Sequence, residues 1–310
     1  MPISNFPNGF ANGVSIRGVP LLSAYPGDVY WVDSVNGSDG NKGTFDRPFA
    51  TIDYAIGRCT ANKGDIVMVK AGHTETVIAA AGIVVDVAGV AIIGLGTGSL
   101  RPTITFSTAV GADMDIDANN VTLSNLLFTS GIDALTGPID VNAADFSMIN
   151  CETRDVTGQT TDWIVVATAG ADRGLISGHV HRGAAADGGD TWLSIREAVD
   201  GWTVEDVWID GNFDEGCVEN VTTACTNLTV CGATRPSFFR NRGSEDLIVA
   251  LTATTTGNVG PNICARLADN AANITEAFAG ADMQFFQPIN IVNADGESSL
   301  QTNITASTDA

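Results

Sequence analysis

Three aspartates at alternate positions form the first set of residues that could do chemistry. They occur in Asp113-Met114-Asp115-Ile116-Asp117, and a β-strand would place all three carboxylates on one face. Two carboxylates at a fixed separation can cleave a glycosidic bond, and a cluster of carboxylate oxygens can bind Ca²⁺. The same alternation is what any strand with one buried face requires. We therefore favour a solvated acidic strand face over a glycosidase pair or a calcium site.

A second group of oxygen ligands lies in one loop near the N-terminus. Asp33, Asp39 and Asp46 are interleaved with Asn36 and Asn41. The EF-hand spacing and its closing glutamate are absent. Asx turns, in which an Asp or Asn side chain accepts a hydrogen bond from its own loop, account for these residues as well as a bound cation does. Ca²⁺ is the one cofactor that the sequence leaves open, and no other is predicted.

The histidines and cysteines give weak signals for a metal site or a nucleophile. His179 and His181 share a strand face and His73 sits in a turn, without an acidic or cysteine ligand at metal-site spacing. No Gly-x-Ser-x-Gly nucleophile motif occurs. The cysteines lack Cys-x-x-Cys spacing, so we expect small buried side chains, with a local disulfide in the segment 217–231 as the alternative. The six positions are Cys59, Cys151, Cys217, Cys225, Cys231 and Cys264.

The composition narrows the class of protein. The chain has 310 residues and a net charge of −21, with only three lysines. Nucleic acid and anionic membranes need clustered Lys and Arg, so we expect neither as a partner. Asp outnumbers Glu by 27 to 9, and because Asp favours turns while Glu favours helices, this bias predicts a turn-rich all-β fold.

A degenerate repeat supplies the elements that would position these side chains. Its clearest copy, residues 117–128, is a polar turn with tandem asparagines followed by alternating apolar residues, which is typical of a half-buried strand. The repeat predicts a β-solenoid, because each copy combines short strands with polar turns and lacks a long helical segment. Taking Gly89, Asn120, Asp145, Asp172, Gly201 and Cys225 as equivalent gives steps of 31, 25, 27, 29 and 24 residues.

The N-terminal part differs from the repeat. Residues 1–28 are apolar residues broken by Gly, Pro and Asn, which predicts an extended arm that lies on another surface. Val29–Val32 and the segment 64–72 are predicted strands, and 48–56 is a predicted short helix with Thr51 as its cap.

The C-terminal part loses the rhythm of the repeat after about residue 257. Residues 262–278 fit either a helix or a turn followed by a last coil. We assign 258–310 to a C-terminal cap or subunit contact followed by a loose tail, because the open end of a solenoid must be covered.

The stretch from Val32 to Thr44, followed by Pro48 to Ile52 and the strand in 64–72, resembles the N-terminal start of right-handed parallel β-helix proteins of the pectate-lyase-like superfamily. The leader over residues 6–22 is similar to leaders on β-helix proteins encoded among tailed-phage structural genes. The resemblance implies an all-β, right-handed parallel β-helix over 29–257, with a short N-terminal capping helix and an extended arm over 1–28.

Polysaccharide lyases of this fold use an acidic cluster that holds Ca²⁺ and a basic residue on an adjacent coil. The resemblance would carry these roles to a set of charged residues. Three tryptophans in the same region could stack on sugar rings. One of them, Trp202, occupies an apparent core position of its coil. No lyase motif aligns with them, so we assign no catalytic, cofactor-binding or metal-binding residue. The set is Asp206, Asp210, Asp214, Arg196, Arg240 and Arg242, with Trp192, Trp202 and Trp208.

Two functions follow as hypotheses. The first is a non-enzymatic virion protein, a capsid-decorating, cement or head-associated homotrimer whose arm binds the major capsid protein or another virion protein. The N-terminus lacks the charged start and apolar core of a signal peptide, so we expect synthesis in the host cytoplasm and localisation in the virion. The alternative is a tailspike-like polysaccharide lyase or hydrolase that acts on host surface glycans.

Overall fold

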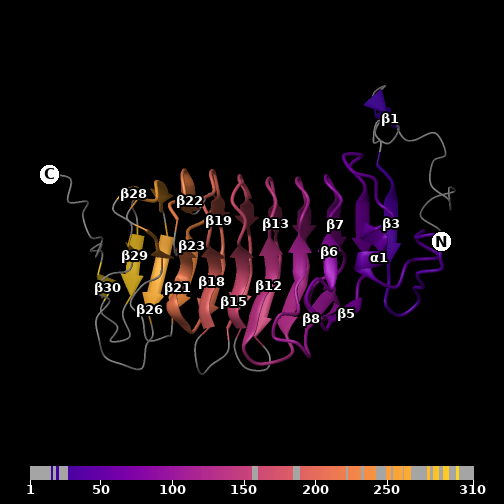
Figure 1. Ribbon diagram of the computed structural model, residues 1–310, viewed down its shortest axis with the longest axis horizontal. Coiled ribbons are helices and arrows are strands. Elements are labelled where there is room, and N and C mark those ends of the chain that lie inside the picture. Colours follow the sequence, from indigo (N-terminus) through magenta and orange to yellow (C-terminus); the bar gives the residue numbers. More distant parts are fainter. Residues whose placement is uncertain are drawn as a thin grey trace.

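The coils of this chain stack into an elongated β-helix (Figure 1). The computed structural model describes residues 15–16, 19–20, 27–155, 160–183, 189–220, 223–231, 234–241, 249–252, 254–260, 262–266, 278–279, 282–285, 289–292 and 298–299. Successive strands pair with strands one coil away in the sequence rather than with their chain neighbours. The fold is the predicted right-handed parallel β-helix.

Three sheets run along the β-helix, and each coil from the one that begins with β4 to the one that begins with β25 adds one strand to each sheet in turn. Sheet 1 contains β3 (Val29–Val32), β4 (Ile66–Val69), β7 (Ala91–Gly94), β10 (Thr122–Ser124), β13 (Ser147–Ile149), β16 (Leu175–Ser177), β19 (Thr203–Glu205), β22 (Leu228–Cys231), β25 (Gly257–Val259) and β28 (Met283–Phe285). Sheet 2 contains β5 (Thr74–Val77), β8 (Thr103–Phe106), β11 (Leu127–Ser130), β14 (Glu152–Asp155), β17 (Val180–Arg182), β20 (Trp208–Gly211), β23 (Ser237–Asn241), β26 (Asn262–Arg266), β29 (Ile289–Val292) and the antiparallel β30 (Ser298–Ser299). Sheet 3 contains β6 (Ile83–Val85), β9 (Met114–Ile116), β12 (Leu135–Val141), β15 (Thr160–Val166), β18 (Gly189–Ile195), β21 (Phe213–Asn220), β24 (Val249–Ala250) and β27 (Phe278–Ala279).

The polar turn before each strand of sheet 1 sets the repeat. One residue per turn has a positive φ, and its N–H donates to the next coil, as Asn120 does to the Ala144 carbonyl over 3.0 Å. The acceptor is a carbonyl except at Asn227, whose N–H donates to the Thr256 hydroxyl. Four of the six predicted equivalences hold, but Asp172 and Cys225 are wrong by one and two residues, because the left-handed backbone position and not the polar side chain defines the turn. The equivalent residues are Gly89, Asn120, Asp145, Arg173, Gly201 and Asn227.

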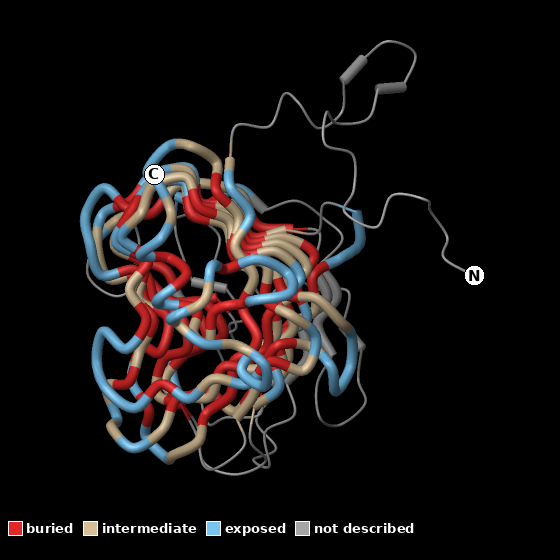
Figure 2. The backbone as a smooth tube through the Cα atoms, turned by 90° about the vertical axis from the view of Figure 1, so that its right-hand side faces the viewer, coloured by how far each residue is buried: buried red, intermediate tan, exposed pale blue. Residues whose placement is uncertain are grey.

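The core is a column of inward side chains that stack coil upon coil. In sheet 2 the register aligns Ile104, Phe128, Thr153, His181 and Ile209, and each is fully buried. Viewed along the β-helix axis, buried residues line the interior and exposed residues occupy the outer turns (Figure 2). Each coil therefore buries its apolar face on its neighbours, as the repeat predicted.

The predicted capping helix is confirmed as α1 (Ile52–Ile56). The Thr51 hydroxyl caps it by accepting a hydrogen bond from the Tyr54 N–H at 3.3 Å. Ile52, Ala55 and Ile56 are buried against the first coil, so the helix covers that end of the core. The short 3₁₀ helix η1 (Gly98–Leu100) joins sheets 1 and 2 farther along. No helix within the described part of the chain has the length and apolar character needed to cross a lipid bilayer.

Beyond residue 257, parallel pairing continues through β28 and β29. The segment 262–266 is a strand, which fits the last-coil alternative for this region and not the helix. The division into 1–28, 29–257 and 258–310 remains a prediction. At the other end, β1 (Ser15–Ile16) and β2 (Val19–Pro20) pair antiparallel with each other, and β1 stands clear of the stacked coils (Figure 1). The rest of the predicted arm before residue 27 lies outside the described residues.

Candidate functional site

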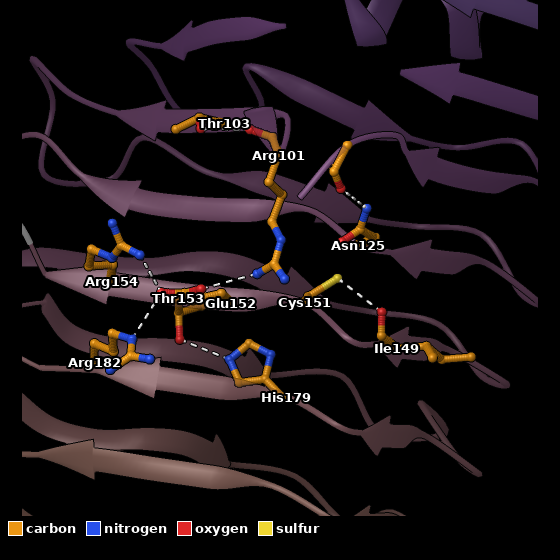
Figure 3. A network of polar contacts seen from close by, with 11 residues as sticks. Arg101, Thr103, Asn125, Ile149, Cys151, Glu152, Thr153, Arg154, His179 and Arg182 are labelled. Atoms are coloured by element: carbon orange, nitrogen blue, oxygen red, sulfur yellow. Dashed lines mark hydrogen bonds and ion pairs between the residues drawn. The ribbon is translucent and has the colours of Figure 1, made fainter. Parts of the chain in front are cut away.

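The outer face of sheet 2 carries a cluster of arginines around one glutamate (Figure 3). The Glu152 carboxylate accepts from Arg101 Nη1 at 3.1 Å, Arg154 Nη2 at 2.5 Å and Arg182 Nε at 3.2 Å. The side chains of Arg154 and Arg182 are 42% and 61% exposed. Three guanidinium groups around one carboxylate leave excess positive charge on an otherwise acidic protein, which suits an anionic ligand.

The same face carries an aromatic pair on the next two coils. Trp208, which is 46% exposed, stacks on Phe238 with ring centroids 4.1 Å apart. Arg240 and Asp210 form a two-point ion pair beside them, with Arg240 Nε donating to Asp210 Oδ1 at 2.8 Å. An exposed indole flanked by fixed charges is a surface on which a sugar ring could stack.

The predicted lyase set is otherwise scattered. Asp206 caps the turn before β23 by accepting from the Thr234 N–H at 2.9 Å, while Arg196 donates to Asp162 on sheet 3 at 2.7 Å. Asp214 is exposed at the start of β21. Of the set, the described structure thus brings together Asp210, Arg240 and Trp208 alone; Arg242 lies outside the described residues.

The other two tryptophans are core residues. Trp192 is fully buried, and Trp202 is 1% exposed with its Nε1 donating to the Ala171 carbonyl at 2.6 Å. Neither can reach a glycan. The core position inferred for Trp202 from the alternation of its coil is confirmed.

The acidic triplet lies on the outer face of sheet 3, as the alternation predicted. Met114 and Ile116 are fully buried, and Asp115 between them points outward, in register with Asp140 of the next coil. Burial, with repulsion from Asp113 and then Asp117, raises the pKa of Asp115 to about 6.

Asp162 and Glu219 extend the set of outward carboxyl groups that begins with Asp115 and Asp140, and we call this set on sheet 3 the acidic strip. Burial raises the pKa of Asp162 to about 6 even though Arg196 opposes the shift. Burial and a hydrogen bond with Glu215 raise the pKa of Glu219 to about 8. Among the described residues no group of three His, Cys, Asp or Glu side chains is placed to hold a metal ion. Glu219 is only 7% exposed, which denies a polymeric substrate access to it.

The histidines predicted to share a strand face belong to the core. His179 Nε2 and His181 Nδ1 both contact the Thr153 hydroxyl at 2.9 Å, and both rings are fully buried. Burial lowers the pKa of His179 to about 3, so the ring is neutral at physiological pH. His73 is also buried, with Nε2 3.1 Å from Glu75 Oε2. Aromatic packing and Thr153 account for the pair better than a metal does.

The N-terminal loop is ordered by its own carboxylates. Asp33 accepts from the Val35 N–H at 2.9 Å, and Asp39 accepts from the Ala50 N–H at 2.9 Å and from Thr51. These contacts favour the Asx-turn interpretation, and bound Ca²⁺ stays a prediction. Cys217, Cys225 and Cys231 form no disulfide with one another, so the predicted local disulfide is wrong. Cys217 and Cys225 are buried, as small packed side chains should be, and Cys231 is half-buried.

Sequence reasoning missed the arginine cluster and most of the acidic strip. Glu152 and Arg182 are 30 residues apart, and Asp162 and Arg196 are 34 apart. Only the register between coils brings such residues together, and a repeat of variable length does not give that register from sequence.

Comparisons with known proteins identify no family for this chain. No protein-family model matches the sequence, and no curated protein matches it at a significant level. Among solved structures, a rhamnogalacturonan lyase is similar over 77% of this chain and 69% of its own, with 14% sequence identity and a TM-score of 0.43. At that identity and TM-score neither an activity nor a site residue transfers to this chain. The chain is an all-β parallel β-helix.

Proposed function

We propose that this chain is a non-enzymatic virion structural protein, a capsid-decorating, cement or head-associated β-helix anchored by residues 1–28. The observation that carries the proposal is that β1 and β2 pair with each other and with no described strand of the three sheets. All three sheets of the described β-helix are formed without β1 and β2. An apolar segment outside a core most often lies on another surface.

The absence of an assembled catalytic set among the described residues supports the non-enzymatic part of the proposal. Asp210 is held by Arg240, Asp206 caps a turn, and Asp162 is held by Arg196. Each of these carboxylates already has a structural role. A general base must instead be within reach of a substrate proton.

The proposed assembly is a homotrimer that binds the major capsid protein or another virion protein, after synthesis in the host cytoplasm. A net charge of −21 favours a partner surface with basic patches. We propose no nucleic acid, membrane or cofactor as a partner.

Deleting residues 1–25 is expected to weaken binding to virus particles that lack this protein at least tenfold, because the deletion removes the anchor and leaves the coils intact. Co-sedimentation with the particles measures the affinity. A variant whose leader is replaced by a Gly/Ser sequence of equal length controls for chain length and should bind as weakly as the deletion. Unchanged binding by either variant would show that the leader is not the anchor.

The alternative function is a lyase or hydrolase of host surface polysaccharide, which the exposed Trp208–Phe238 stack beside Asp210 and Arg240 favours. Incubation with host capsule and with uronate-containing polymers, followed by detection of unsaturated or reducing ends, tests it. We expect no turnover. Turnover that is abolished by Asp210→Ala and retained by Asp46→Ala, which changes an exposed loop carboxylate, would establish the enzyme and overturn the structural proposal.

A further inference from the structure

The outer face of sheet 1 differs from the other two faces in its lack of charge. Six outward residues on its first three strands are apolar, and the register places them in two adjacent columns. Their alternates Val67, Val69 and Ile92 are buried inside. The six are Val29, Trp31, Ile66, Met68, Ala91 and Ile93.

The uncharged strip continues along the β-helix and then ends. The outward positions of β10, β13 and β16 carry Ser, Thr, Ile149 and Leu175, all partly exposed. Within the strands of sheet 1 the first charged outward residue is Glu205 of β19, although Lys70, directly after β4, holds its ammonium 4.4 Å from the Phe45 ring centroid. Phe45, which is 58% exposed, extends the apolar end by contacting the Trp31 ring edge-on, with centroids 4.9 Å apart. Apolar character is therefore greatest at the end where the chain leaves the leader.

We propose that two or more copies of this chain associate in parallel through this outer face of sheet 1. Copies that each carry −21 repel one another, so they can approach most closely through a face without carboxylates. Sheet 3 presents Asp115 and Asp140 outward, and sheet 2 presents charges of both signs, with the arginines around Glu152 and the Arg240–Asp210 pair. Two copies would have to desolvate these charges to pack through either face, which leaves the uncharged strands of sheet 1 as the most favourable face among the described residues.

The uneven distribution of apolar residues fixes the direction of association. In a parallel arrangement related by rotation about an axis parallel to the β-helix axis, each coil meets the same coil of the other copy, so the apolar ends meet each other. In an antiparallel arrangement that overlaps along the strip from β3 to β16, Met68 would instead face β13, where Ser147 points outward. Parallel copies also bring their leaders to one end, where several could bind a single particle with gain from effective concentration.

The size of the strip indicates weak association of the free protein. Strands lie about 4.8 Å apart, so the six strands from β3 to β16 span roughly 25 Å, and a strip about 14 Å wide covers roughly 350 Å² per copy. A stable dimer usually buries about 800 Å² per partner. We therefore expect association in the micromolar range or weaker, strengthened by salt because salt screens the repulsion between copies.

Sedimentation velocity of the full chain from about 1 to about 500 μM, at low and high NaCl, tests the inference. We expect the mean mass to rise with concentration and with salt. Met68→Glu places like charges opposite each other and should weaken association at least tenfold, while Thr76→Glu on the exposed outer face of β5 adds the same charge with little effect. Circular dichroism and the melting temperature verify that both variants fold.

A mixture of two charge variants tests the parallel direction. Residue 68 meets residue 68 in the parallel arrangement, whereas in an antiparallel pair that overlaps along the whole strip from β3 to β16 it meets β13. Met68→Glu mixed with Met68→Lys should therefore recover association that neither variant shows by itself. A monomer under all conditions, or association unchanged by Met68→Glu, would overturn the inference. So would loss of particle binding by Met68→Glu without any change in self-association, because the face would then belong to the virion partner.

The inference rests on the self-assembly in the proposed function, but no particle is present in the sedimentation test. Failure of that test therefore leaves the anchoring role of the leader standing.

Discussion

Replacing Trp202 with alanine is expected to lower the free energy of unfolding by about 4 kcal/mol, because large-to-small changes of a buried aromatic residue leave a cavity. Trp202 is 1% exposed, and its Nε1 donates to the Ala171 carbonyl at 2.6 Å. The ring also lies so close to Gly174 that a Cβ there would be 2.4 Å from it. The substitution therefore removes packing and leaves a buried carbonyl without its partner.

Trp208→Ala is the matched control, because it removes the same side chain from the outer face of the next strand of the same coil. Trp208 is 46% exposed and contacts Phe238 face to face, so we expect a loss of about 1 kcal/mol or less. Urea denaturation followed by circular dichroism gives both values. Equal losses for the two variants would mean that the inward and outward positions assigned to these coils are wrong.

The contrast between these tryptophans shows how far sequence reasoning reaches. Alternation along a single strand tells inside from outside, which is why the inward position of Trp202 and the outward face of the acidic triplet on β9 follow from the amino-acid sequence alone. The capping helix was predictable for a similar reason, since Thr51 and the apolar spacing behind it are local signals. Such predictions use residues that are close in the sequence.

Contacts between coils escape this kind of reasoning. The steps between equivalent turn residues vary, and a slip of one residue turns every side chain of a strand to the other face. The wrong placement of Asp172 and Cys225 as turn residues shows the error, because the structure puts Arg173 and Asn227 there. The contacts of Glu152 with Arg101 and Arg182, and of Asp162 with Arg196, depend on the same register, and so no site made across coils could be identified from the sequence.

The raised pKa values along sheet 3 give the fold an expected dependence on pH. For Asp115, Asp162 and Glu219 the folded state holds the proton more tightly than the unfolded state. Their contribution to stability is fully present below the unfolded pKa, near 4, and is lost as the pH rises through about 6 and then about 8. Asp145 and Asp200 act oppositely, because the hydrogen bonds from Arg173 and from Thr226 lower their pKa values. Their contribution is lost as the pH falls below about 4.

The melting temperature should therefore be highest near pH 4 and about 5 °C lower at pH 8, a shift of the size that a few kcal/mol produces in a chain of this length. Glu219→Gln should remove most of the decline between pH 6 and 8, because the amide can donate a hydrogen bond to Glu215 as the protonated carboxyl does but cannot ionise. Asp46→Asn, which changes an exposed loop carboxylate, should keep the wild-type profile. Thermal melts followed by circular dichroism at constant ionic strength measure these profiles. A melting temperature that rises from pH 5 to 8, or a Glu219→Gln profile as steep as wild type, would mean that the acidic strip of sheet 3 is ionised in the native state. Its carboxylates would then be available to bind cations, and the acidic face of sheet 3 would return as a candidate Ca²⁺ surface.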